Sequence, residues 1–197
     1  MNAVELNPSE IGQQYFYGEG RRKSYRAAFP YLLAAAKRGD RHCENLVGYC
    51  YHQGLGVDKD GRAAVLWFRR AARHDDPERL FNLALAYEKG QNVRVDSKRA
   101  FSLYKRAAEL GDLPSQTNLA IAYSEGIGTA PDLAKALEWV RKAARAGDSR
   151  AQYNLGLAYL EGTGTRPNRR AALRWLGKAA GQGYKKASRK IAALNAR

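Results

Sequence analysis

The sequence contains few of the residues that carry metal, redox or nucleophilic chemistry. Its 197 residues include two cysteines, Cys43 and Cys50, and three histidines, His42, His52 and His74. On one helix the cysteines would lie about 10 Å apart along the axis, too far for a disulfide, and no C-x-x-C pattern indicates zinc. We interpret the cysteines as small buried residues and the histidines as structural or solvent-exposed. We expect no cofactor, no metal site and no enzymatic activity.

Long hydrophobic runs are also missing. No stretch approaches the roughly 20 apolar residues that a membrane-spanning helix needs. The first residues, MNAVELNPSEIGQQ, lack the basic segment and apolar run of a signal peptide. We therefore expect a cytoplasmic protein; a periplasmic or secreted location would require that an export signal had been removed. Abundant alanine and sparse β-branched residues favour helices.

Acidic residues are absent after Glu161. The net charge is +15, and the last 36 residues carry ten basic residues, whereas the first 161 have a net charge of only +5. An uneven distribution of charge along a chain is informative about its binding partners and says little about its fold. The predicted basic patch consists of Arg166, Arg169, Arg170, Arg174, Lys178, Lys185, Lys186, Arg189 and Lys190.

What the sequence does contain is a repeat of 36 residues. A tyrosine recurs at this spacing and is followed three residues later by glycine, and alanine pairs recur at the same interval. The copies show no insertion or deletion, which is typical of a repeat protein. The tyrosines are Tyr15, Tyr51, Tyr87, Tyr123 and Tyr159.

Each repeat is predicted to contain two helices, called here helix A and helix B. In the last full copy, helix A covers about residues 149–161 and ends at Gly162, because glycine accepts the positive φ of a helix C-terminus. Such short helices are marginal alone, so stacked neighbours must bury the tyrosine, tryptophan and alanine positions in one continuous core. Helix B begins after residues that suit an N-cap: Ser24, Asp60, Asp96, Asp132 and Asn168.

These motifs resemble the Sel-one-like repeat (SLR), a bacterial relative of the tetratricopeptide repeat. The resemblance rests on A-x-x-x-L-G-x-x-Y, G-x-G, A-x-x-W and K-A-A-x-x-G, best seen from Ala151 to Gly183, and covers residues 5–184. It implies an all-α, right-handed α-solenoid of five antiparallel helix pairs plus a C-terminal capping helix, in one domain over residues 1–197. The predicted repeats are residues 5–40 (degenerate), 41–76, 77–112, 113–148 and 149–184, followed by the cap, 185–197.

The resemblance also allows a prediction about the cellular compartment, because some members of the family contain disulfides. Some bacterial members tie each repeat with a disulfide between the end of one helix B and the next helix A. Cys43 lies near such a position, but its expected partner is alanine, at Ala35 or Ala36. This departure argues against the secreted subgroup and for a reducing compartment.

Helical stacks offer a concave face lined by the A helices. The apolar residues predicted to line this groove could equally serve packing, whereas for the asparagines a structural role, tying one repeat to the next, is favoured over ligand binding. Amides that donate and accept suit an extended peptide. The predicted groove residues are Tyr49, Phe81, Asn82, Leu85, Asn118, Ile121, Tyr153, Asn154 and Leu157.

The resemblance implies a non-catalytic protein-interaction module, such as an adaptor, a regulator or an immunity protein that neutralises a toxin. The alternative is electrostatic binding of nucleic acid or an anionic membrane surface through the basic C-terminal end. An acidic protein partner is favoured over nucleic acid, because aromatic residues for base stacking are few in that end. A monomer is favoured.

Overall fold

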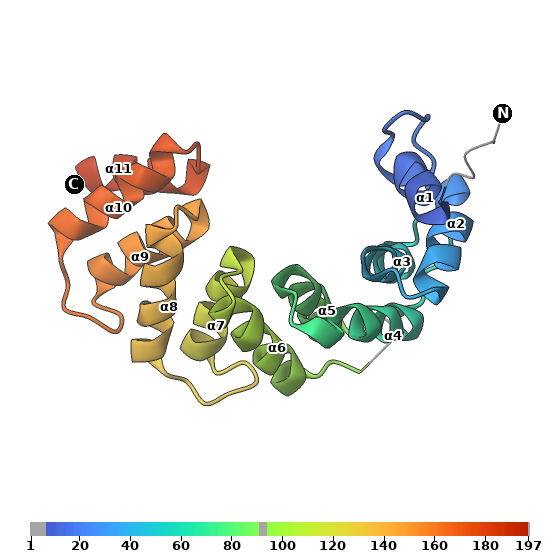
Figure 1. Cartoon of the computed structure of the whole chain (residues 1–197). Coiled ribbons are helices and arrows are strands. Elements are labelled where there is room, and N and C mark those ends of the chain that lie inside the picture. The colour runs from blue at the N-terminus through green and yellow to red at the C-terminus, as the bar shows by residue number, and fades with distance from the viewer. Residues whose placement is uncertain (1–6, 91–93, 197) are drawn as a thin grey trace. The chain divides into compact units, whose positions relative to one another are not determined.

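The computed structural model describes residues 7–90 and 94–196, and within these ranges every regular element is helical (Figure 1). The chain divides into two compact units, residues 1–100 and 101–197, and the boundary falls within α6. The helices are α1 (Pro8–Tyr17), α2 (Tyr25–Lys37), α3 (Arg41–Gln53), α4 (Gly61–Ala71), the 3-10 helix η1 (Ala72–His74), α5 (Pro77–Lys89), α6 (Ser97–Glu109), α7 (Leu113–Glu125), α8 (Leu133–Arg145), α9 (Ser149–Glu161), α10 (Arg169–Gly181) and α11 (Lys185–Asn195).

Within each unit, consecutive helices pack on one another. In the N-terminal unit α1 packs on α2, α2 on α3, α3 on α4 and α4 on α5; in the C-terminal unit α7 packs on α8, α8 on α9, α9 on α10 and α10 on α11. This succession of helix pairs is the arrangement of an all-α solenoid and confirms the predicted fold class. The lone helix α11 follows the last pair, as the sequence predicts for residues 185–197.

The predicted N-caps of helix B are confirmed. The side chain of each accepts a hydrogen bond from the third residue of its helix, for example Asp132 from the Lys135 N–H at 3.0 Å and Asn168 from the Ala171 N–H at 2.9 Å. The backbone N–H of each cap also donates to the carbonyl of the repeat tyrosine, as in Asp132 to Tyr123 at 2.7 Å. Each repeat tyrosine therefore fixes, through its backbone, where the next helix begins.

Glycines end the A helices as predicted. Gly54, Gly126 and Gly162 adopt positive φ at the C-caps of α3, α7 and α9, where other residues would be strained. Asp75 takes positive φ, 53°, at a position where the other repeats have glycine, and it follows the 3-10 turn η1.

The core is less uniform than the repeat predicts. The alanine pairs are largely buried, and Tyr87 and Tyr123 are buried, but the rings of Tyr15, Tyr51 and Tyr159 are only half-buried. The prediction of uniformly buried tyrosine and tryptophan positions is therefore wrong in part, and Trp139 is likewise half-buried. Cations cover some of these rings: Arg141 lies 5.9 Å from the Tyr159 ring centre and Arg21 5.1 Å from that of Tyr15.

The pairs pack closely where helix A carries glycine. A Cβ atom on Gly48 would lie 2.6 Å from the Phe68 ring, and one on Gly156 would lie 2.7 Å from Leu176 Cγ. Large residues of helix B thus sit directly against the backbone of helix A.

Candidate functional site

A pocket in the C-terminal unit brings together three of the residues predicted to line a groove. It lies among α7, α8 and α9 and has a volume of about 350 Å³. Ile121 lines it from α7, and Asn154 and Leu157 line it from α9. All three side chains are half-buried, so they present part of their surface to the pocket.

The lining of the pocket divides into an apolar and a polar part. α8 contributes Leu133, Leu137 and Val140, which lie opposite small residues of the flanking helices. The polar part faces solvent, because three of its members are exposed. It consists of Ser124, Glu125, Asn154, Glu161 and Thr163.

The pocket owes part of its volume to Leu137. This residue occupies the repeat position of Phe29 and Phe101, which meet the tyrosine of the following repeat edge-on, with ring centres 5.3 and 5.2 Å apart. Leucine cannot extend so far toward Tyr159. The pocket wall therefore has a leucine where two other repeats have an aromatic ring.

Val140 has the same effect one turn further along α8. It takes the repeat position of Phe68 and Tyr104, both of which are buried large rings. Valine is much shorter, and the opposing residue on α7 is Ala120, which also lines the pocket. Leu137 and Val140 thus line the pocket at positions where the preceding repeat carries aromatic rings.

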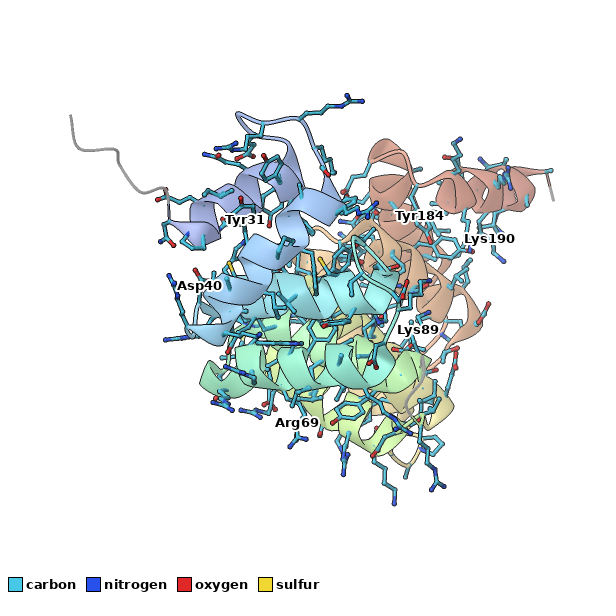
Figure 2. All side chains as sticks on the ribbon, turned by 90° about the vertical axis from the view of Figure 1, so that its right-hand side faces the viewer. Tyr31, Asp40, Arg69, Lys89, Tyr184 and Lys190 are labelled. Atoms are coloured by element: carbon cyan, nitrogen blue, oxygen red, sulfur yellow. The ribbon has the colours of Figure 1, made fainter. Side chains whose placement is uncertain are left out.

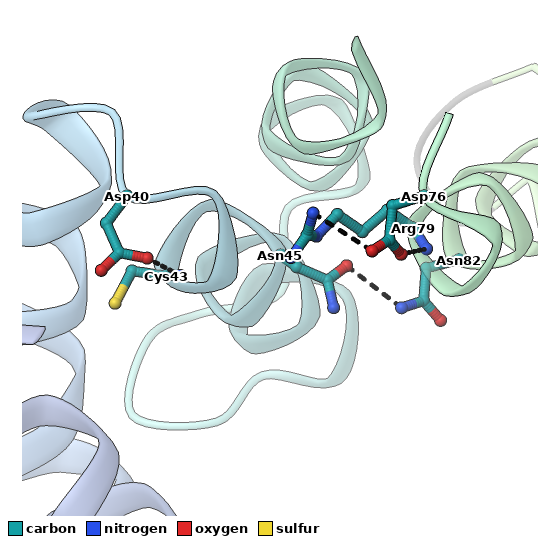
Figure 3. A network of polar contacts seen from close by, with 6 residues as sticks. All are labelled: Asp40, Cys43, Asn45, Asp76, Arg79 and Asn82. Atoms are coloured by element: carbon teal, nitrogen blue, oxygen red, sulfur yellow. Dashed lines mark hydrogen bonds and ion pairs between the residues drawn. The ribbon is translucent and has the colours of Figure 1, made fainter. Parts of the chain in front are cut away.

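The predicted groove residues of the N-terminal unit are placed differently. Asn82 donates its amide to the Asn45 carbonyl oxygen in the preceding repeat at 3.1 Å (Figure 3), and Asn45 is buried. Phe81 and Leu85 are half-buried. Tyr49 is exposed and meets the edge of Phe16. Asn82 therefore connects consecutive repeats.

Two further predicted groove residues in the C-terminal unit make contacts away from the pocket, one of them to the next repeat. The Asn118 side-chain oxygen accepts a hydrogen bond from Arg150 at 3.0 Å. The Tyr153 ring packs on that of Tyr184, with centres 5.3 Å apart, in the cluster beneath α11. Neither lines the pocket, so the structure brings together only part of the predicted stripe.

Five successive segments of the chain match the family model of the Sel1 repeat: residues 10–40, 42–76, 80–112, 113–148 and 149–184. The chain belongs to the Sel1-repeat family. The resemblance stated from the sequence is thereby confirmed, and Sel1 repeats generally mediate protein–protein interaction. No curated protein matches the chain.

Solved structures agree with this assignment. A Sel1-repeat protein from Oxalobacter formigenes is 31% identical, with a TM-score of 0.88 over 100% of this chain and 82% of its own. A protective antigen with an SLR fold from uropathogenic Escherichia coli is also 31% identical, with a TM-score of 0.86 over 91% of this chain. This chain spans only 38% of that antigen. An immunity protein from Pseudomonas aeruginosa, at 19% identity, shares the fold, with a TM-score of 0.57 over 95% of this chain and 70% of its own.

Some basic residues of the B helices lie over a tryptophan ring of the same helix. Lys142 and Lys178 each lie over the tryptophan three residues earlier, 4.6 and 4.5 Å from the ring centre, as Arg70 does over Trp67. These cations therefore cover aromatic rings of their own helix, a contact favoured by the ring quadrupole.

The predicted basic patch is only partly available to a partner. Lys178 and Arg174 lie over Trp175, and Arg169 donates to the Leu194 carbonyl at 2.8 Å. Lys190 lies on α11 (Figure 2), and its side chain is half-buried. The exposed remainder is Arg166, Arg170, Lys185, Lys186 and Arg189.

A column of aspartates that the sequence analysis missed begins the A helices. Asp40, Asp76, Asp112 and Asp148 are spaced by 36 residues, and each accepts a hydrogen bond from the backbone N–H three residues on (Figure 3). The spacing was a usable signal. Burial alone would raise the pKa of Asp40, but hydrogen bonds from the Ser9 hydroxyl and the Cys43 N–H lower it.

Cys43 and Cys50 are both fully buried and unpaired, as small core residues are expected to be. Burial raises the pKa of Cys43 to about 11 and that of Cys50 to about 12. His52 is buried at the edge of the Phe68 ring, and His42 lies 3.2 Å from the Tyr17 hydroxyl. In the described residues, 7–90 and 94–196, no three metal-ligating side chains cluster, and no helix could span a membrane.

Proposed function

We propose that this chain is a non-catalytic protein-interaction module that binds a partner protein through the pocket formed by α7, α8 and α9. The observation that carries the proposal is the convergence of Ile121, Asn154 and Leu157 on a pocket of about 350 Å³. Apolar walls beside a side-chain amide suit a peptide segment, because the amide can donate and accept while an apolar side chain is buried. Membership of the Sel1-repeat family supports this function.

A paired variant tests this proposal. Ile121→Ser combined with Leu157→Ser removes apolar surface from the pocket, whereas Leu66→Ser changes an exposed leucine on α4 and serves as control. Each chain is immobilised and exposed to an extract of the native host. A partner should be retained by the wild type and by the control and lost from the paired variant, while circular dichroism shows equal helix content in all three. Equal retention by all three would contradict the proposal.

The finer role of such a module is adaptor, regulator or immunity-type binder. The Pseudomonas aeruginosa immunity protein supports the last of these only through its fold. If the chain is an immunity-type binder, the captured partner should be a toxin whose activity the wild-type chain suppresses. Suppression should then disappear in the Ile121→Ser, Leu157→Ser variant.

The alternative function is electrostatic binding of an acidic partner through the basic C-terminal end. It is supported by the exposed cations Arg166, Arg170, Lys185, Lys186 and Arg189 in a segment without acidic residues. Binding to a DNA duplex or to anionic vesicles should then weaken steeply as salt rises. Reversing the charge of Lys185 and Lys186 should reduce it, and binding that is indifferent to both changes would contradict the alternative.

We also propose a reducing, cytoplasmic compartment, which two buried and unpaired thiols support. Fractionation of the native host should recover the chain with both cysteines alkylatable after denaturation without a reductant. Recovery from an oxidising compartment would contradict this.

A further inference from the structure

The charge around the pocket is opposite to that of the chain. The chain has a net charge of +15, yet among the described residues that line the pocket the ionisable ones are two glutamates, Glu125 and Glu161. They occupy one repeat position, at the last residue of α7 and of α9. In the three preceding repeats this position holds Tyr17, Gln53 and Lys89. The acidic pair is therefore confined to the repeats that form the pocket.

The fold makes no visible use of these carboxylates. Both are exposed, and in the described part of the chain neither forms an ion pair. The acidic residues that do serve the fold act differently: Glu44 is buried and paired with Arg70 at 3.0 Å, and the aspartate N-caps bind backbone N–H groups. Glu125 and Glu161 are thus available to a cation brought by a partner.

The glutamates favour a cation on the bound segment, and the apolar part of the same pocket favours an apolar side chain. Its volume of about 350 Å³ is at the small end of the roughly 300–1,000 Å³ found for ligand pockets. A pocket of this size accepts one large apolar side chain. Leu137, Val140 and Leu157 supply its apolar wall, and the two glutamates flank it.

We propose that the pocket binds a peptide segment of a partner protein in which a large apolar side chain is adjacent to lysine or arginine. This inference rests on the proposed function and adds the chemistry of the bound segment. The apolar side chain enters the space left by Leu137 and Val140, and the adjacent cation lies near Glu125 or Glu161. The amide of Asn154 is placed to hydrogen-bond the peptide backbone.

The test uses a displayed library of random heptapeptides, selected on the immobilised full-length chain. Peptides retained by the wild type should be enriched in an apolar residue next to lysine or arginine. Fluorescence polarisation then measures the affinity of the enriched peptides for the Ile121→Ser, Leu157→Ser variant and for three further variants.

The first variant fills the pocket with the residues that other repeats of this chain already carry. Leu137→Phe combined with Val140→Tyr reproduces Phe101 and Tyr104 of the third repeat, where the matching helix A residue is also alanine, Ala84. The variant should therefore fold, which its circular dichroism and thermal unfolding verify. It should bind the enriched peptides at least about tenfold more weakly, because one well-placed side chain often carries such a share of the affinity.

The second variant, Glu125→Gln with Glu161→Gln, removes the charge while keeping the shape. It should weaken binding by roughly threefold per glutamate at low salt, as exposed ion pairs do, and should abolish the preference for lysine or arginine in a repeated selection. The third variant, Glu138→Gln, removes an exposed acid of α8 that does not line the pocket, and it should bind as the wild type does.

The outcomes separate the two proposals. If enriched peptides lose affinity for the Ile121→Ser, Leu157→Ser variant but show no basic preference, or bind the filled variant unchanged, the present inference is wrong and the proposed function stands. If no peptide is enriched, or the enriched peptides bind all variants equally, both are wrong. Self-association in light scattering that the filled variant abolishes would identify a second copy of this chain as the occupant, and would also overturn the inference.

Discussion

Two equivalent sites in this molecule, one repeat apart, have different interiors. Phe101 on α6 meets Tyr123 on α7 edge-on, and Tyr123 is only 8% exposed. One repeat later, Leu137 and Val140 on α8 take the positions of Phe101 and Tyr104 and line a pocket, and Tyr159 on α9 is half-buried. The backbone caps are the same at both sites. The comparison shows that the same backbone caps can enclose interiors that are filled differently.

The largest expected difference is between the two tyrosines. Tyr123→Ala removes a buried ring packed against Phe101 and should cost about 3–5 kcal/mol of unfolding free energy, as large-to-small changes in cores do. Tyr159→Ala removes a ring that is only half-buried and should cost clearly less. Urea unfolding of both variants measures this. Equal losses would show that the two interiors do not differ as described.

A pair of glycines tests how tightly the filled interior is packed. Gly156→Ala places a Cβ 2.7 Å from Leu176 Cγ and should cost about 1–3 kcal/mol, as overpacking does. Gly177→Ala lies on α10 with nothing within 4 Å of the new Cβ and should stabilise by up to about 1 kcal/mol through helix propensity. Thermal unfolding should shift in opposite directions. A shift in the same direction would contradict the close contact of α9 with α10.

The single change Leu137→Phe tests the origin of the pocket directly. It should place a ring edge-on to Tyr159, as at Phe29 and Phe101, and stabilise the chain by about 0.5–1.5 kcal/mol, the usual value of an aromatic pair. A crystal structure of the variant should show a smaller pocket. Destabilisation with an unchanged pocket would mean that something other than the missing ring keeps the site open.

The smallest expected effect concerns another position that differs between repeats. His52 and Phe16 occupy one repeat position and are equally buried. Burial lowers the pKa of His52, with smaller contributions from Lys59 and Lys89. The unfolded chain therefore binds a proton at a higher pH than the folded chain, so that stability is fully present above the unfolded pKa of about 6.5 and is lost as the pH falls below it.

His52→Phe, which copies Phe16, should reduce the loss of unfolding free energy between pH 7 and pH 5. His42→Gln, at a half-buried histidine beside Tyr17, is the control. Urea midpoints at the two pH values measure the effect. A His52→Phe chain with the full pH dependence of the wild type would rule out this histidine as its source.

The sequence by itself determined the helices and their ends. The glycine C-caps, the N-caps Asp132 and Asn168 and the 36-residue register could all be predicted, because capping depends on a few residues that are close in the chain. The aspartate column that includes Asp148 was readable in the same way but was missed. The Sel1-repeat family followed from the same local motifs.

Only the tertiary structure decided which side chains line the pocket and which contact another repeat. Asn82, Asn118 and Asn154 occupy one repeat position, yet the first bonds Asn45, the second accepts from Arg150, and the third lines the pocket. Their different contacts depend on neighbours about one repeat away, which the local pattern does not contain. The pocket likewise depends on the combined volume of α7, α8 and α9, since a void exists only where several side chains all fail to fill the same space.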